Sequence, residues 1–236
     1  SFMDSSFTSW ISLFYSIATI IIFSLWYQKR FHALDVAAIP SHFNGKLILG
    51  IVLLTPGLQY ATTYLINFIS MLRPQWLRSY ESLMETAGLT DVSLILACYA
   101  VVLGPISEEL IYRGVTLSYA KKELPFWAAN LTQSILFGVY HMNILQGIYA
   151  FFIGLFLGFV CHKTKSIFPS MLLHICFNLW GVFATNELFM YKIDTPFFFI
   201  FWLVAGILLT VLGMFFIKSG SGTRNVVRET DGPFDM

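Results

Sequence analysis

The sequence predicts an all-α protein: a polytopic transmembrane helical bundle of about seven spans, or eight in an alternative layout, plus one interfacial helix. Hydrophobic residues make up 57% of the 236 residues, and charged residues only 11%. An average soluble domain carries about 25% charged residues. Apolar runs near the ~20 residues needed to cross a bilayer recur along the chain. The net charge of +1 gives no indication of a nucleic-acid partner.

The expected spans follow one another with short polar connections. They are residues 8–27, 46–72, 91–120, 125–141, 143–160, 167–186 and 196–217. Residues 73–88 mix apolar and charged side chains at helical spacing, which predicts an amphipathic helix in the interface. Pro56 predicts a kink or a break in the second span. The segment 91–120 is too long for one untilted span, so Pro105 leaves a tilted helix or two pieces as alternatives.

Small residues and charges add to this layout. In the fifth span, three glycines at small-residue spacing favour close helix packing: Gly147, Gly154 and Gly158. Most basic residues fall on one side of the predicted membrane: Lys29, Arg30, Lys46, Lys121, Lys122, Lys163, Lys165, Lys218, Arg224 and Arg228. The other side has Arg73, Arg78 and Lys192. The positive-inside rule therefore predicts an external N-terminus and a cytoplasmic C-terminus.

The bundle is expected to be one domain, residues 3–218, with a functional core at 101–181. Residues 219–236 form a polar tail, which this orientation places in the cytoplasm. Ser1 and Phe2, which precede Met3, are set aside as a remnant of cloning.

A few strongly polar side chains lie deep in the predicted spans: Glu108, Glu109, Arg113, His141, His174 and Asn178. A charged side chain at the centre of a bilayer costs about 2.5–3.5 kcal/mol on the translocon scale. Arg113 follows Glu109 by four residues, so the two share a helix face and can pair. His174 and Asn178 are also four residues apart. The polar faces of these separate spans must meet inside the bundle, since none is stable against lipid.

Two interpretations account for these residues. In the first they only pack helices together, but neutral polar contacts suffice for that and average about 0.6 kcal/mol. In the second they are catalytic. Peptide hydrolysis needs an activated water, a proton shuttle and a stabilised oxyanion, and a desolvated glutamate can act as a base near neutral pH. One glutamate and two histidines could instead bind a catalytic zinc ion. Residue types alone do not separate the last two mechanisms.

Three motifs resemble those of one family. Glu108-Glu109-Leu-Ile-Tyr-Arg113 resembles the EExxxR motif of the CPBP intramembrane proteases, the CAAX-protease and bacteriocin-processing family, also called Abi. Phe137-Gly-Val-Tyr-His141 is similar to its FxxxH motif, and His174-Ile-Cys-Phe-Asn178 to its HxxxN motif. All three occur in the family's order.

The resemblance implies a helical membrane fold with a catalytic cavity open to the bilayer. Glu108 would be the base that activates water, assisted by His141. His174 and Asn178 would hold the oxyanion, with Glu109 and Arg113 in support. No metal is favoured. Zinc is the alternative, and its ligands would be Glu108, His141 and His174.

The predicted function is an intramembrane endopeptidase acting on a membrane-associated peptide or protein, in CAAX-type, bacteriocin or peptide-pheromone processing. The alternatives are a non-catalytic scaffold or bacteriocin-immunity protein, and an ion-coupled transporter, against which the lack of internal repeats counts. Membrane lipid and the peptide substrate are the expected partners. The expected location is a bacterial plasma membrane, crossed several times.

Overall fold

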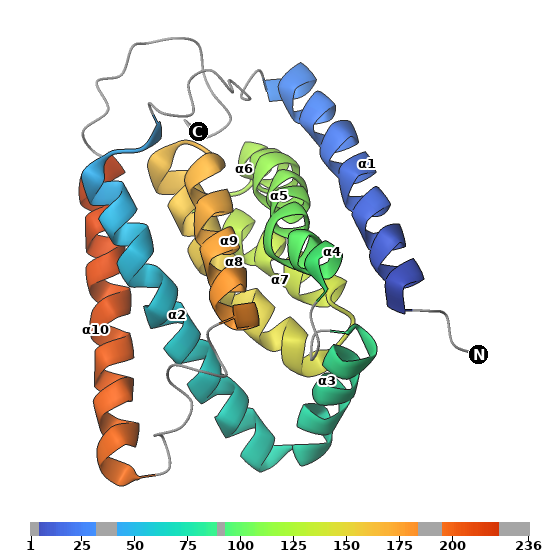
Figure 1. Cartoon of the computed structure of the whole chain (residues 1–236). Coiled ribbons are helices and arrows are strands. Elements are labelled where there is room, and N and C mark those ends of the chain that lie inside the picture. The colour runs from blue at the N-terminus through green and yellow to red at the C-terminus, as the bar shows by residue number, and fades with distance from the viewer. Residues whose placement is uncertain (1–4, 32–41, 89–92, 184–194, 222–236) are drawn as a thin grey trace.

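A computed structural model describes residues 5–31, 42–88, 93–183 and 195–221, and within these ranges the long elements are all helical (Figure 1). In chain order the elements are α1 (Ser5–Phe31), α2 (Gly45–Leu72), α3 (Pro74–Thr86), α4 (Leu94–Ala97), η2 (Cys98–Leu103), α5 (Gly104–Glu109), η3 (Leu110–Thr116), α6 (Leu117–Glu123), α7 (Phe126–Tyr140), α8 (Ile144–Thr164), α9 (Phe168–Phe183) and α10 (Pro196–Ser221).

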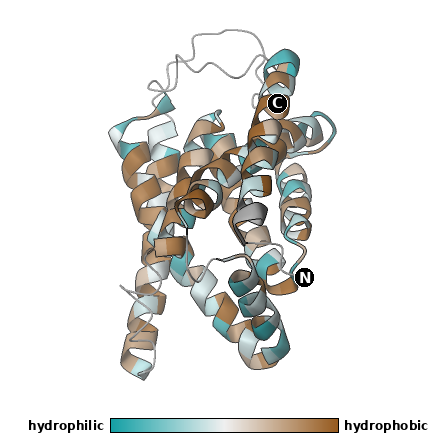
Figure 2. Cartoon of the chain, turned by 45° about the vertical axis from the view of Figure 1, so that its right-hand side comes forward, coloured by the Kyte–Doolittle hydropathy of each residue, from teal (hydrophilic) through white to brown (hydrophobic). Residues whose placement is uncertain are grey.

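Five helices in the described residues are long and apolar enough to cross a membrane: Trp10–Phe31, Gly45–Leu72, Leu94–Glu123, Ile144–Thr164 and Pro196–Ser221. Helix α9 is a shorter apolar helix, and α7 has 15 residues. Hydrophobic residues cover much of the helices' length, whereas hydrophilic residues gather near their ends and on α3 (Figure 2). The predicted fold class, a polytopic helical bundle, is therefore confirmed, and the chain is a multi-pass membrane protein.

Short connections keep neighbouring helices antiparallel. Leu124 and Pro125 join α6 to α7, residues 141–143 join α7 to α8, and residues 165–167 join α8 to α9. Two of these turns use a residue with positive φ, Met142 at 54° and Lys165 at 55°. The ends of α1, α6, α8 and α10 and the starts of α2, α7 and α9 lie at one end of the bundle, the upper end in Figure 1.

This upper end carries most of the basic residues in the described part of the chain. Lysines or arginines occupy the last turns of α1, α6, α8 and α10: Lys29, Arg30, Lys121, Lys122, Lys163 and Lys218. Lys46 is the second residue of α2, and Lys165 follows α8. Arg73 and Arg78 lie at the opposite end, at the start of α3 and within it. The expected basic residues at 192, 224 and 228 lie outside the described residues.

Helices α2 and α10 pack backbone to backbone, at the left of Figure 1. A Cβ atom added to Gly213 would lie 2.8 Å from the backbone nitrogen of Leu54, and one added to Gly57 would lie 2.7 Å from that of Thr210. Only glycine allows this approach. Of the kink and the break expected at Pro56, the break does not occur, because α2 runs without interruption from Gly45 to Leu72.

The segment that carries the two glutamates is one continuous helical run from Leu94 to Glu123. This settles the choice between one helix and two pieces. The run is not a regular α-helix: two π-helical stretches, η2 and η3, lie on either side of α5. Pro105 lies just after η2, inside this continuous run, where its missing N–H removes one helical hydrogen-bond donor. Wider turns of this type occur often at functional sites.

Candidate active site

Glu109 and Arg113 form an ion pair at the centre of the bundle. Both side chains are fully buried, and Arg113 Nη1 donates a 2.8 Å hydrogen bond to Glu109 Oε1. Arg113 Nη2 also reaches the backbone carbonyl of Gly154 on α8, at 3.4 Å. A buried charge is tolerated when it is paired and hydrogen-bonded. The pair expected from the spacing of four residues is therefore present, and it also connects η3 to α8.

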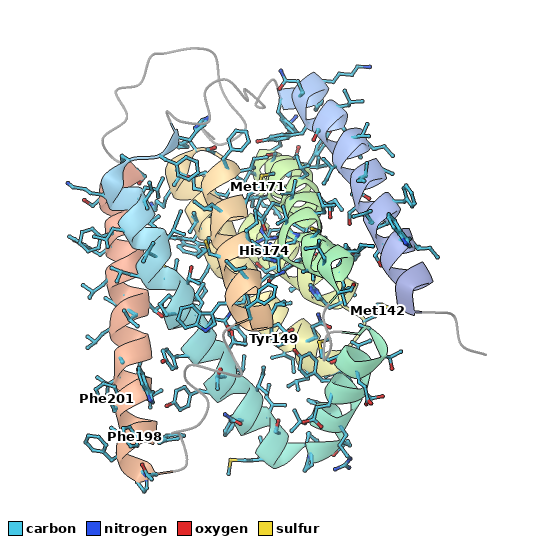
Figure 3. The ribbon with its side chains drawn as sticks, viewed as in Figure 1. Met142, Tyr149, Met171, His174, Phe198 and Phe201 are labelled. Atoms are coloured by element: carbon cyan, nitrogen blue, oxygen red, sulfur yellow. The ribbon has the colours of Figure 1, made fainter. Side chains whose placement is uncertain are left out.

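His174 of α9 lies between the two glutamates. Its Nδ1 atom is 3.0 Å from Glu109 Oε1, and its Nε2 atom is 3.6 Å from Glu108 Oε2. A carboxylate can only accept a hydrogen bond, so Nδ1 carries the proton of the shorter contact and Nε2 faces Glu108. Figure 3 shows His174 inside the bundle, where α9 packs beside α5. This histidine joins the first and the third sequence motif.

The two adjacent glutamates differ in their surroundings. The Glu108 side chain is 14% exposed, whereas that of Glu109 is 0% exposed. Glu108 also lies within electrostatic range of the His141 imidazole and of four phenols, those of Tyr99, Tyr112, Tyr140 and Tyr149. Glu108 is thus the acid that a substrate or a water molecule can reach, and Glu109 is enclosed by protein.

Phe137 organises the second motif. Its carbonyl lies 2.9 Å from His141 Nδ1, a contact in which the ring nitrogen donates because a carbonyl only accepts. The Phe137 ring meets His141 edge to face at 4.9 Å and His174 at 5.7 Å, and the Arg113 guanidinium lies 4.4 Å from its centre. One aromatic ring therefore contacts three of the six predicted site residues. His141 keeps its Nε2 atom available for chemistry.

Asn178 connects α9 to the backbone of the helical run that carries the glutamates. Its Nδ2 atom donates a 2.9 Å hydrogen bond to the backbone carbonyl of Ala100 in η2. His174, one turn earlier, is directed at the two carboxylates. The two side chains share a helix face, as the spacing predicts, and each has its own partner within the bundle.

The alternative zinc site does not match this geometry. Among the described residues, no group of three or more His, Cys, Asp or Glu side chains could hold a metal ion. His174 instead has one ring nitrogen committed to Glu109 and the other facing Glu108. Within the described part of the chain, Glu108, His141 and His174 do not form a three-ligand group.

The sequence reading missed a buried amide network behind the ion pair. Gln133 of α7 donates through Nε2 to the Gly154 carbonyl at 3.0 Å and to Asn130 Oδ1 at 2.7 Å. Asn130 Nδ2 in turn donates to the Leu155 carbonyl of α8 at 3.1 Å. Both side chains are fully buried. Their spacing with Phe137 and His141 along one helix face was a signal that could have revealed them.

Comparison with known proteins supports the family reading. The family model described as "Type II CAAX prenyl endopeptidase Rce1-like" matches residues 90–180, which contain all three motifs. The CPBP resemblance is confirmed. A Bacillus subtilis (strain 168) protein named "Putative membrane peptidase YdiL" is 27% identical over 110 residues.

The similarity is confined to part of each protein. The alignment with the Bacillus relative covers 47% of this chain and 45% of that protein. No solved structure matches the chain. The CPBP motifs and their geometry therefore carry the functional argument, while α1, α2 and α10 lie outside the region that the family model matches.

Proposed function

We propose that this protein is an intramembrane endopeptidase in which Glu108 activates the water that attacks a peptide bond. The observation that carries the proposal is the buried chain Glu108–His174–Glu109–Arg113, in which each group contacts the next. In this chain, Glu109 orients the His174 imidazole through Nδ1, and Nε2 of the same ring faces Glu108. It combines a base, a proton carrier and a fixed support in one place.

Glu108 is the better candidate for the base. Its side chain retains some exposure, and its contact with His174 is longer than that of Glu109. Glu109 already accepts hydrogen bonds from Arg113 and His174, so a water molecule would have to displace protein to reach it. Its role in the proposal is to hold His174 and to fix which ring nitrogen carries the proton.

The proposed reaction uses the groups as follows. Glu108 removes a proton from water, and the hydroxide adds to the carbonyl carbon of the scissile bond. His174 Nε2 faces Glu108 and can share the proton that Glu108 has taken from water. With this proton, His174 can stabilise the developing oxyanion and then protonate the leaving amine. The C–N bond then breaks to give a carboxylic acid and an amine. His141, held through Nδ1 by the Phe137 carbonyl, would assist in positioning the water.

The proposed substrate is a peptide or protein whose cleavage site lies at or in the membrane, of which a prenylated CAAX C-terminus is the type that the family description names. The apolar helices around the site support a lipid-embedded substrate. The basic end of the bundle supports an orientation with that end in the cytoplasm. We place the protein in a bacterial plasma membrane; bacteriocin and pheromone precursors are further substrates to be tested.

Replacement of Glu108 by glutamine tests the proposal. The probes are an internally quenched peptide ending in a farnesylated CAAX sequence and the same peptide without the lipid, with products identified by mass. General acid–base catalysis contributes roughly 100- to 10,000-fold, so we expect Glu108→Gln to lower kcat/KM by at least about 100-fold. The exposed acid of α6 provides the matched control, Glu123→Gln, which should cleave normally.

Two outcomes would contradict the proposal. Purified Glu108→Gln protein that still cleaves at the wild-type rate would exclude Glu108 as the base. Wild-type protein that cleaves neither CAAX probe, nor a bacteriocin or pheromone precursor peptide, would contradict the endopeptidase function itself. Thermal unfolding in detergent should show equal stability for both variants, so that lost activity is not mistaken for lost folding.

Metal dependence has its own test. We propose that the reaction needs no metal, since the site offers a carboxylate base and a supported imidazole in place of a ligand set. Elemental analysis of active protein should then find no stoichiometric zinc, and a chelator should leave the cleavage rate unchanged. Stoichiometric zinc, removed together with activity and restored with it, would contradict this part of the proposal.

A further inference from the structure

The carbonyl group of Ala100 lacks a helical hydrogen-bond partner. In the π-helical turn η2, the N–H of Gly104 donates to the carbonyl of Tyr99, five residues back. The next donor in that register would be the N–H of residue 105, directed at the Ala100 carbonyl. Residue 105 is proline and has no N–H. The backbone of this turn therefore leaves an acceptor unsatisfied inside the membrane region, where each such group is costly.

Asn178 of α9 supplies the missing donor. Its Nδ2 atom lies 2.9 Å from the Ala100 oxygen, within the usual range for an N–H···O hydrogen bond. The two residues are 78 positions apart in the chain, so this bond holds α9 directly against the helix that carries the glutamates. We propose that Asn178 is a positioning residue that replaces the hydrogen bond withheld by Pro105 and so fixes His174 between Glu108 and Glu109.

The opposite side of α9 is held in a similar way. Gln59, a buried residue of α2, donates through Nε2 to the carbonyl of Phe177 at 2.6 Å. Adjacent residues of α9 therefore bond to α2 on one side and to η2 on the other. Phe177 and Asn178 lie three and four residues beyond His174, roughly 4.5 and 6 Å along the helix axis. A rotation or slide of α9 would have to break both bonds before it could change the His174 contacts.

This role differs from that of an oxyanion donor, and it rests on the proposed function only for its catalytic consequence. An oxyanion donor acts on the substrate, so its loss cannot be compensated by a change elsewhere in the backbone. A positioning residue acts through the Ala100 carbonyl. Any other donor to the same carbonyl should therefore take over its role.

Replacement of Pro105 by alanine creates such a donor. The new N–H of residue 105 can bond to the Ala100 carbonyl in the register that Gly104 and Tyr99 already use. The test compares Asn178→Leu, Pro105→Ala and the double variant. Each is measured by thermal unfolding in detergent and by kcat and KM for the peptide probe that the wild type cleaves.

We expect Asn178→Leu to lower kcat about 10- to 100-fold, because a misplacement of about 1 Å at a catalytic group has an effect of this size. The KM should change little, since Asn178 is not expected to contact substrate. Pro105→Ala alone should be nearly silent. In the double variant, most of the lost kcat and of the lost thermal stability should return.

A control separates this contact from the other bond to α9. Gln59→Met removes the contact from α2 and should also lower kcat, but Pro105→Ala should not rescue it. The inference is overturned if the double variant Asn178→Leu, Pro105→Ala is no more active and no more stable than Asn178→Leu. That result would support the oxyanion role of Asn178. Thermal stability can be measured whether or not the protein cleaves a peptide. A failed rescue of stability can therefore be told apart from a failure of the proposed function, which the Glu108 experiment tests.

Discussion

The α2–α10 pair and the α5–η3–α9 group are both tightly packed, but different interactions hold them. Helices α2 and α10 meet through glycines, aliphatic side chains and aromatic rings. Hydrogen bonds between them include those from Asn44 Nδ2 to the Gly220 carbonyl at 2.9 Å and from the Tyr64 hydroxyl to the Phe199 carbonyl at 2.6 Å. The active-site group instead has carboxylates, a guanidinium, an imidazole and carboxamides at its centre.

The difference shows which polar groups the fold needs for assembly. Close packing of small residues is enough to associate membrane helices, as α2 and α10 illustrate. Charged groups at depth add a cost that packing does not require. Their concentration in one half of the bundle therefore reflects the chemistry of the site, and the two halves should respond differently to substitution.

The largest effect is expected where a buried charge loses its partner. Arg113→Met leaves Glu109 fully buried without its cationic partner, which should cost about 3–5 kcal/mol of unfolding free energy. The double variant Glu109→Met, Arg113→Met removes the stranded charge and should be more stable than Arg113→Met alone. A double-mutant cycle from chemical unfolding in mixed micelles measures the coupling. Losses that simply add would show that the two side chains are not energetically coupled.

A smaller but still large effect is expected from the glycine contact. Gly213→Val places side-chain atoms where the Leu54 backbone now lies, and overpacking of this kind costs about 1–3 kcal/mol. Activity at low temperature should survive, because α10 contributes none of the site residues. Gly45→Val is the matched control, since nothing lies within 4 Å of an added Cβ there. Equal melting temperatures for the two variants would mean that α2 and α10 do not depend on close approach.

Disruption of the amide network between α7 and α8 should have an intermediate effect on both stability and activity. Gln133→Met keeps the volume but removes the donor to Gly154 and Asn130, at a cost of about 1–2 kcal/mol. Since Gly154 also accepts from Arg113, kcat should fall while KM stays nearly constant. Gln75→Met, on the exposed face of α3, is the control. A change in KM alone would argue that Gln133 faces substrate and does not support Arg113.

The smallest effect is expected at α3, where no residue of the helix is buried. The Tyr80 and Tyr149 hydroxyls are 3.4 Å apart, at the long limit for a hydrogen bond. Tyr80→Phe should therefore change stability by no more than about 0.5 kcal/mol. A large loss on thermal unfolding would show that α3 is an integral part of the bundle. It would then no longer fit the interfacial helix that its amphipathic pattern predicts.

The sequence predicted the positions of the helices because apolar runs and basic flanks are local signals. The pairing of Glu109 with Arg113 was also predictable, since spacing along one helix determines it. The glycine contacts of α7 and α8 were predicted at Gly147, Gly154 and Gly158, whereas the seven-residue spacing of Gly206, Gly213 and Gly220 on α10 was visible but overlooked.

Contacts between helices were harder to predict. Which carboxylate His174 meets depends on the rotation of α9 relative to α5, and two π-helical turns change that rotation by amounts that no propensity indicates. The partner of Asn178 is a backbone carbonyl. Every residue has such a carbonyl, so the residue type does not mark this one as a partner. Pro105 was the available clue, because a missing N–H implies an acceptor that needs another donor.

The unequal exposure of the two glutamates has a consequence for covalent probes and inhibitors. A carbodiimide reaches only carboxyl groups that solvent or lipid can approach, so within the site it should modify Glu108 and spare Glu109. An inhibitor should accordingly be designed to engage one acid and the Nε2 face of one imidazole. A chelating group built to bridge both acids would find the second already occupied by arginine and histidine.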